Sequence, residues 1–337
     1  MIIRLLRRLF LLLFLLGIGA AIYGYKLYQQ SLNAPLQASG AAILHVAKGS
    51  NINRIAHDLQ AHGLQHPWAL ILHARLNGGA AQIKAGDYRI EPNMSTLDLL
   101  NNLQTGKVIV LQFQIIEGKR SADLLRQIAA TTELKHELSG KSEAEIAAIL
   151  GINGSLEGQF LPDTYHFHYG DSDIDLLKHM HQALQNTLAQ AWETRAAKDT
   201  LNSPYEALIL ASIIEKETDI ADERAQISGV FHRRLQQNMR LQTDPTVIYG
   251  IGEQYQGNLT RRDLQTDTPY NTYTRYGLPP TPIALASAAS IKAALNPQTG
   301  DSLYFVANGT GGHTFSATYQ EHQKAVQTYR RSQKESP

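Results

Sequence analysis

A long apolar segment that ends in two carboxylates constrains this 337-residue chain more than any other feature. Residues 205–214 read YEALILASII, and Glu215 and Glu217 follow directly. The Ser-Pro-Tyr-Glu sequence at 203–206 predicts a helix start, because proline suits the first helical position and Ser-x-x-Glu forms a capping box. A helix with so few polar sides is buried all round, so we expect the chain to build a core around it.

The two glutamates face different sides of this helix. They stand two residues apart, about 200° around the axis, and cannot act as a pair on one face. Glu217 lies above Leu210, Ile213 and Ile214, the more apolar neighbourhood. Burial raises the pKa of a carboxyl, which suits a group that protonates a leaving oxygen near neutral pH. Glu217 is therefore the first candidate acid and Glu215 the second; the alternative is that both are ordinary solvated residues.

The composition excludes several classes of protein. A formal net charge of +1 argues against a dedicated nucleic-acid binder with a basic face. The absence of cysteine rules out thiol catalysis, disulfides and cysteine zinc sites. The His-Glu-x-x-His motif of zinc hydrolases is missing as well. We therefore expect neither a metal nor an organic cofactor.

The N-terminus carries a candidate membrane span. Residues 9–25 contain no charge, and three arginines precede them while Lys26 follows. Seventeen residues are about the shortest helix that crosses a bilayer. The excess of arginine before the span predicts that residues 1–8 lie in the cytoplasm and that everything after about residue 26 lies outside the inner membrane. A cleaved signal peptide is the alternative, because small residues interrupt the apolar run.

We expect residues 26–40 to form a polar linker and residues 41–120 to form one or two small α+β modules. The pattern begins with a strand at Ala42–Val46, continues through helices that include His66–Leu76, and returns in a strand at Tyr88–Ile90. This order resembles a LysM module, a small glycan-binding fold. A packing domain without a binding role fits the same pattern.

Residues 121–200 are expected to form a mainly helical connecting region. Glu143–Leu150 and Asp173–Ala197 have helical spacing of their apolar residues. Between them, residues 155–165 combine aromatic side chains with proline and aspartate. Such a loop suits the neighbourhood of a cleft that binds sugars, and it suits equally a loop that plugs the core.

Residues 201–337 are expected to form the catalytic domain, with a strand at Leu303–Val306. A helix is predicted at Asp222–Gln237, where aspartate and glutamate in the first turn favour the helix dipole. Arg233 and Arg234 near its end are expected on a solvated face, and pairing with carboxylates or contact with an anionic polymer is the alternative.

The segment after this helix is rich in groups that hold sugars. Gln242, Thr243 and Tyr249 offer an amide, a hydroxyl and an aromatic ring. Asp244 precedes Pro245, so its side chain is predicted to cap a short helix that closes at glycine 250. A sugar-binding role for Asp244 is the alternative.

Five blocks of sequence stand out in the second half of the chain. They are ASIIEKET at 211–218, MRLQTDPTVIYG at 239–250, PYNTY at 269–273, GLPP at 277–280 and GGHTF at 311–315. Together these blocks resemble the endolytic murein transglycosylase (MltG, YceG-like) family. The likeness covers nearly the whole chain and is densest from about residue 155 to 316.

The resemblance implies an activity and a place for it. Members of this family cleave the β-1,4 bond between N-acetylmuramic acid and N-acetylglucosamine inside a peptidoglycan strand, without water, and leave a 1,6-anhydro end. The catalytic glutamate of the family falls on Glu217. A single-pass inner-membrane protein with a periplasmic catalytic domain is implied. Peptidoglycan-synthesis enzymes would be its natural partners, because strand termination takes place where new strands emerge.

Further candidates for holding the substrate follow from the resembling blocks. Gln242, Asn271, Tyr273 and His313 are expected to grip the sugar. Turn stabilisation is the alternative for Asn271, and backbone satisfaction is the alternative for His313. Two other functions stay open at this point. The chain could be a membrane-anchored glycan-binding protein without catalysis, or a muramidase that uses water with Asp244 or Glu215 as the second carboxylate.

Overall fold

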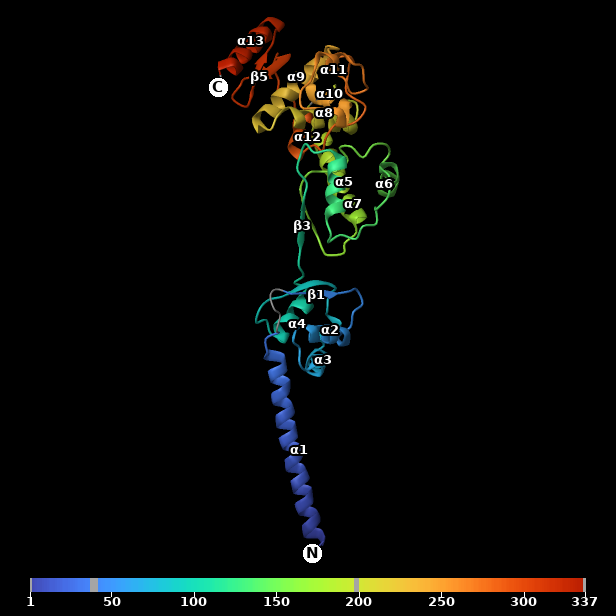
Figure 1. The fold of residues 1–337 in the computed structure, drawn as a ribbon, viewed down its shortest axis with the longest axis vertical. Helices are drawn as coiled ribbons and strands as arrows, with labels where there is room; N and C mark the ends of the chain where they lie inside the picture. The colour runs from blue at the N-terminus through green and yellow to red at the C-terminus, as the bar shows by residue number, and fades with distance from the viewer. Residues whose placement is uncertain (1, 37–41, 197–199, 336–337) are drawn as a thin grey trace. The chain divides into compact units, whose positions relative to one another are not determined.

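The computed structural model describes residues 2–36, 42–196 and 200–335 (Figure 1). The chain divides into two compact units. The first unit holds residues up to 111 together with 166–169, and the second holds residues 112–165 and 170–337. Helices predominate, and the described strands pair in two-stranded sheets. This mixture agrees with the predicted α+β class.

Helix α1 (Ile2–Asn33) opens the first unit. Among the described residues it is the one helix long and apolar enough to cross a membrane, with a mean hydropathy of 2.2 over an 18-residue window. The helix continues to Asn33, so the predicted linker at 26–40 is wrong for its first residues. The Tyr28 hydroxyl hydrogen-bonds His73 Nδ1 at 2.7 Å, and Leu32 is fully buried, so the end of α1 packs as part of the unit. Residues 37–41 lie outside the described residues.

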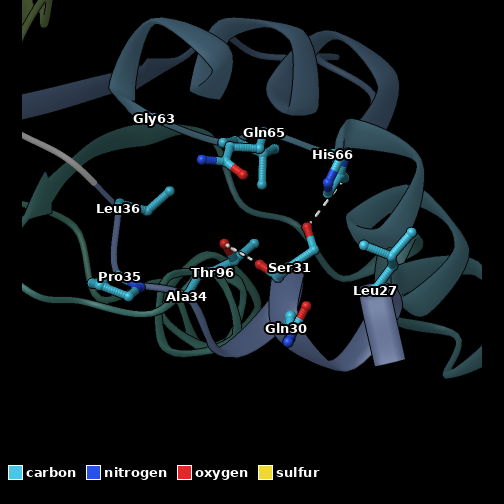
Figure 2. Close-up of a pocket in the computed structure, with 11 residues that line it drawn as sticks. Leu27, Gln30, Ser31, Ala34, Pro35, Leu36, Gly63, Gln65, His66 and Thr96 are labelled. Carbon is cyan, nitrogen blue, oxygen red and sulfur yellow. Dashed lines mark hydrogen bonds between the residues drawn. The ribbon is translucent and has the colours of Figure 1, made fainter. Parts of the chain in front are cut away.

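Figure 2 shows how the last turn of α1 is held. The Ser31 hydroxyl donates to the His66 carbonyl at 3.4 Å, and Thr96 Oγ1 donates to the Ser31 carbonyl at 3.3 Å. A cavity of about 230 Å³ lies beside these bonds. The end of α1 is therefore fixed to two other segments of the unit.

The rest of the first unit is a small α+β module. Strands β1 (Ala42–Val46) and β2 (Gly86–Ile90) pair antiparallel, with Ala42 opposite Ile90. Helices α2 (Ile52–Asp58) and α3 (Pro67–Leu76) lie between them in sequence, and α4 (Thr96–Thr105) follows. The predicted strand–helix–helix–strand order is confirmed, whereas the likeness to LysM stays a prediction.

The second unit is mainly helical. Strand β5 (Tyr304–Ala307) pairs antiparallel with β6 (His313–Ser316). Strand β3 (Leu111–Gln114) pairs with β4 (Thr164–Phe167), and the boundary between the two units runs through both of these strands. The helices of the second unit are α5 (Ser121–Ala130), α6 (Glu143–Leu150), α7 (Asp173–Glu193), α8 (Pro204–Glu217), α9 (Arg224–Gln236), α10 (Asp244–Ile251), α11 (Arg261–Gln265), α12 (Ala288–Leu295) and α13 (Tyr319–Glu335).

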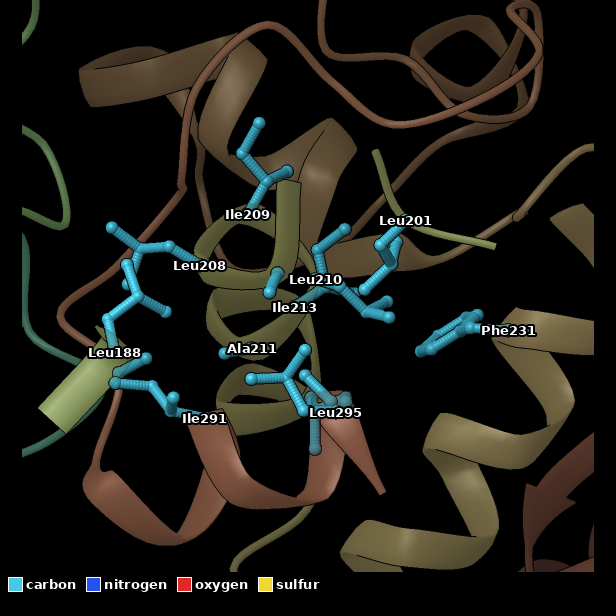
Figure 3. Packing of buried hydrophobic residues seen from close by; sticks show 14 of the residues in the cluster. Leu188, Leu201, Leu208, Ile209, Leu210, Ala211, Ile213, Phe231, Ile291 and Leu295 are labelled. Atoms are coloured by element: carbon cyan, nitrogen blue, oxygen red, sulfur yellow. The ribbon is translucent and has the colours of Figure 1, made fainter. Parts of the chain in front are cut away.

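Helix α8 runs through the centre of this unit, as its sequence predicts. Every residue from Ala207 to Glu215 is buried, and α7, α9, α10 and α12 pack around it (Figure 3). Ser203 caps the helix by accepting from the Glu206 N–H at 3.2 Å. The Glu206 carboxylate accepts from the Asn202 N–H instead of completing the capping box. Burial of the apolar side chains fixes where the helix ends, and thereby where its last residue, Glu217, lies.

Some predicted details near α9 are wrong. The helix begins at Arg224, after a short 3₁₀ turn at Ala221–Glu223. Arg234 is buried and Arg233 half-buried, contrary to the predicted solvated face. Their guanidinium groups donate to backbone carbonyls, Arg233 to Ser302 at 2.8 Å and Arg234 to Leu303 at 2.6 Å. These bonds tie the helix to the segment that leads into β5.

Candidate active site

A cavity of about 410 Å³ in the second unit opens over the end of α8. One wall comes from the segment that leads into α10, and the other comes from β5 and α13. The residues that line it are Glu217, Arg234, Leu241, Gln242, Asp244, Tyr273, Tyr304, Phe305, Val306, Ala307, His313, Tyr319, His322 and Val326. The candidate acid thus faces a space with hydroxyl, amide, imidazole and aromatic groups.

Glu217 is the carboxylate with the most perturbed surroundings in this cavity. Its side chain is partly exposed to the cavity, but protein atoms enclose the carboxyl closely enough to desolvate it. Burial raises the pKa of Glu217 to about 7. A hydrogen bond from Thr243 opposes this rise, the negative charge of Asp244 adds to it, and the positive charges of His313 and Arg234 oppose it. A carboxyl with this pKa is partly protonated at neutral pH.

The bond to Glu217 comes from a residue that the fold holds firmly. The Thr243 hydroxyl donates to Glu217 Oε1. Thr243 is buried, its N–H donates to Thr272 Oγ1 at 3.0 Å, and its carbonyl accepts from Thr246 Oγ1 at 2.7 Å. The donor is therefore preorganised against the acid.

Asp244 does not cap α10. Thr243 occupies the position before the helix, and Asp244 is its first residue. The Asp244 carboxylate accepts from the Tyr273 hydroxyl at 2.5 Å, and both side chains line the cavity. Burial and the Asp244 carboxylate raise the pKa of Tyr273, so its hydroxyl stays protonated. The predicted capping role is wrong, because the side chain points to the cavity rather than to the helix N-terminus.

His313 enters the cavity from the opposite wall, at the start of β6. Glu223 holds it through two bonds, accepting from the His313 N–H at 2.8 Å and contacting Nδ1 at 2.7 Å. The Thr218 hydroxyl donates to the same carboxylate at 3.2 Å. Burial raises the pKa of Glu223, but its bonds to His313 and Thr218 outweigh this and lower it overall. Sequence reasoning missed Glu223, because its partner lies 90 residues away.

Glu215 lies outside the cavity. Its Oε2 accepts from the N–H of Ser287 at 2.8 Å and from the hydroxyl of Ser287 at 2.5 Å. Arg224 Nη2 lies 3.7 Å from Oε1. The Glu215 side chain is buried among these partners at the start of α12. It does not lie beside Glu217 in the cavity.

Asn271 and Tyr249 are also absent from the cavity lining. Asn271 is buried, and its amide donates to the carbonyl of Thr266 at 2.7 Å while its Oδ1 accepts from the Tyr273 N–H at 2.8 Å. It shapes the loop that carries Tyr273. Tyr249 packs on Tyr270, with ring centroids 4.7 Å apart. Of the two interpretations of Asn271, the geometry supports the one in which it stabilises a turn, and the sugar-binding role of Tyr249 stays a prediction.

The loop at residues 155–165 does not reach the cavity either. Glu157 is buried, accepts from the Ser121 N–H at 2.9 Å and hydrogen-bonds Tyr249. Leu156 and Phe160 beside it are buried as well. Of the two interpretations of this loop, the geometry supports the one in which it plugs the core.

Arg234, which was expected on a solvated face, is a further member of the site. It is buried in the cavity wall and donates to the Leu241 carbonyl at 2.8 Å as well as to Leu303. Its guanidinium lies 5.2 Å from the ring centroid of Tyr304. One side chain thus joins the two walls, and it carries a positive charge into the cavity. Within the described ranges, no group of three or more His, Asp or Glu is arranged to hold a metal ion.

Comparison with known proteins agrees with the resemblance seen in the sequence blocks. A protein of Bacillus subtilis (strain 168) named endolytic murein transglycosylase is 30% identical over 335 residues, which cover 93% of this chain and 92% of that protein. A protein of the same name from Streptococcus pneumoniae serotype 2 is 29% identical over 93% of this chain, which spans 62% of that longer protein.

A solved structure shows the same relationship. The crystal structure of a yceG-like protein from Listeria monocytogenes, determined at 2.6 Å, is 28% identical, with a TM-score of 0.51 over 85% of this chain and 99% of that one. The family model described as YceG-like matches residues 44–328. This match includes both walls of the cavity and Glu217. The chain therefore belongs to the YceG-like family.

Proposed function

We propose that this protein is a peptidoglycan lytic transglycosylase, a lyase that cuts glycan strands internally, with Glu217 as its general acid and then its general base. The relatives named endolytic murein transglycosylase support the reaction class. The observation that carries the assignment of Glu217 is its position, enclosed at the base of the cavity with a pKa raised to about 7.

In the first step, the protonated Glu217 donates its proton to the oxygen of the bond between N-acetylmuramic acid and N-acetylglucosamine. The C1–O bond breaks, and positive charge develops at C1 of the muramic acid. A raised pKa keeps the proton available near pH 7, whereas an ordinary glutamate would already be ionised. The leaving sugar departs with a new hydroxyl group.

In the second step, the C6 hydroxyl of the same muramic acid attacks C1. The Glu217 carboxylate takes the proton from that hydroxyl, which restores the acid and closes the 1,6-anhydro ring. No water is consumed, and atoms and charge balance over the two steps. Because the nucleophile belongs to the substrate, one carboxyl suffices where most glycosidases need two.

The groups around Glu217 suit a sugar chain. Tyr273 with Asp244 and Gln242 supply hydroxyl, carboxylate and amide groups on one wall, and His313 supplies an imidazole on the other. We assign them to positioning the two sugars across the acid. Thr243 adjusts the acid through its hydrogen bond.

For the location, we propose that α1 anchors the protein in the inner membrane, with residues 1–8 in the cytoplasm and the second unit in the periplasm. The arginines before the uncharged run support this orientation. Newly made strands would then be the substrate, and peptidoglycan synthases would be partners close to their exit.

Product analysis tests the reaction. The full chain is incubated with purified glycan strands, and the fragments are identified by mass spectrometry. We expect 1,6-anhydro ends inside the strands from the wild type and a loss of about 10²–10⁴-fold in their rate with Glu217→Gln. Glu215→Gln, two residues away but outside the cavity, is the matched control and should keep the activity of each folded molecule.

The rival functions give different products. Reducing ends that carry oxygen from isotopically labelled water would identify a muramidase, and Asp244→Asn would then abolish cleavage, since Asp244 is the other carboxylate in the cavity lining. Binding of strands without cleavage, unchanged by Glu217→Gln, would identify a glycan-binding protein.

A further inference from the structure

Helix α3 of the first unit exposes an unusual apolar face. Trp68, Leu72 and Leu76 are 45%, 42% and 72% exposed. They stand four residues apart, so they lie along one side of the helix. An exposed tryptophan followed by two leucines is characteristic of a face that meets another apolar phase.

Contacts with α1 fix the position of this face. The rings of Tyr28 and Trp68 lie 6.4 Å apart, and the Tyr28 hydroxyl bonds His73 on the next turns of α3. Leu32, one turn further along α1, is in the core. In Figure 1, α3 lies at the side of the unit where α1 enters, and β1 lies at the far side.

The length of α1 sets the depth of this contact in a bilayer. A hydrocarbon core of about 30 Å takes about 20 helical residues at 1.5 Å each. The uncharged run starts at Leu9, so a helix of that length ends near Tyr28. Lys26 lies within its last turn and can extend its ammonium to the headgroups. Trp68, in contact with Tyr28, is therefore at the level of the lipid headgroups, where tryptophan is enriched.

We propose that α3 is an interfacial helix that rests on the outer surface of the bilayer spanned by α1, with Trp68, Leu72 and Leu76 inserted among the lipids. The charge of the helix agrees with this partner, because α3 carries the exposed Arg75 and no acidic residue, which suits lipid phosphates. The first unit is then held against the membrane on two helices instead of hanging from one. This inference rests on α1 being a membrane anchor.

Tryptophan fluorescence tests the contact directly, because the chain has two tryptophans, Trp68 and Trp192. The full-length Trp192→Phe protein is reconstituted into vesicles of phosphatidylethanolamine and phosphatidylglycerol. We expect a blue-shifted Trp68 emission that is quenched by lipids brominated near the headgroup and protected from acrylamide. The protein with both Trp68→Phe and Trp192→Phe, which has no tryptophan, gives the background signal.

Substitution of the face gives a second measurement. Leu72→Glu should reduce the lipid quenching of Trp68, since a carboxylate resists insertion, while Ile43→Glu on the exposed side of β1 should leave it unchanged. A protein that floats with the vesicles but whose Trp68 is open to acrylamide and untouched by brominated lipid overturns the proposal. A protein that does not float with the vesicles contradicts the anchor itself and, with it, the interfacial helix.

Discussion

Thr243 donates a hydrogen bond to the carboxyl of Glu217 from a segment 26 residues further along the chain. The bond stabilises the carboxylate and so lowers the pKa of Glu217, against the burial and the Asp244 charge that raise it. The value of about 7 is thus a balance of opposing effects. The hydrogen bond and the charge belong to different side chains, so each of these two effects can be removed alone.

Removing the Thr243 hydroxyl should make the acid weaker. In Thr243→Val the carboxylate of Glu217 loses its donor, and its pKa should rise above 7. Because the reaction needs the protonated acid, the alkaline limb of the kcat/KM profile should move to higher pH by about one unit, the size expected for a bond to a charged group. Thr243→Ser keeps the hydroxyl and should leave the limb in place. This account would be contradicted if the alkaline limb of the kcat/KM profile of Thr243→Val were unchanged or lay at lower pH.

Neutralising Asp244 should have the opposite effect. Its negative charge raises the pKa of Glu217, so Asp244→Asn should lower that pKa and move the alkaline limb of kcat/KM to lower pH. Asparagine retains an oxygen that accepts from the Tyr273 hydroxyl, so the wall should keep its shape. The measurement is the same pH series as for Thr243→Val. Complete loss of activity at every pH would instead mark Asp244 as a reacting group.

The sequence was sufficient to predict features that depend on neighbouring residues of one helix. The apolar run at 205–214 was sufficient to place α8 in the core, and the residues one turn before Glu217 were sufficient to predict its raised pKa. The predicted positions of Glu215 and Arg234 were wrong because each side chain has its partner far along the chain. Glu215 is held by Ser287, 72 residues away, and Arg234 reaches a carbonyl 69 residues away. The local periodicity of apolar residues predicts helices and strands, but it does not predict which distant segments will contact each other.

The same reason explains why two of the substrate-binding candidates do not line the cavity. Tyr249 and Asn271 have the side chains expected of sugar contacts, but the fold uses one for packing and the other to shape a loop. The wall formed by β5 and α13 was missed because Tyr304, Tyr319 and His322 show no motif. Their aromatic side chains come together only in space, where the rings of Tyr304 and His322 stack 5.2 Å apart.

Glu215 and Glu217 should respond differently to the same change. Glu215→Gln leaves the partly buried Arg224 without a carboxylate, so it should lower the free energy of unfolding of the second unit by about 3 kcal/mol. Glu217→Gln removes a desolvated carboxyl that is half-protonated near pH 7 and should change stability little. Urea unfolding followed by Trp192 fluorescence, in a Trp68→Phe background, measures both. Equal stability of the two variants would contradict the structural role of Glu215.

Glu223 should stabilise the His313 wall in a pH-dependent way. Its folded pKa lies below the ordinary value of about 4.3, so its contribution is fully present above that pH and is lost as pH falls through the lower, folded value. Glu223→Gln should therefore cost about 2 kcal/mol at pH 7 and progressively less as the solution is acidified below pH 4.

The measurement is the unfolding free energy of the wild type and Glu223→Gln across this pH range, read from Trp192. Asp222→Asn, at the exposed carboxylate next to Glu223, is the control and should be neutral. A loss of kcat/KM in Glu223→Gln at pH 7 should accompany the loss of stability, because the imidazole of His313 is then held less firmly in the cavity. A stability difference that persists unchanged at low pH would show that the charge of Glu223 is not what holds His313.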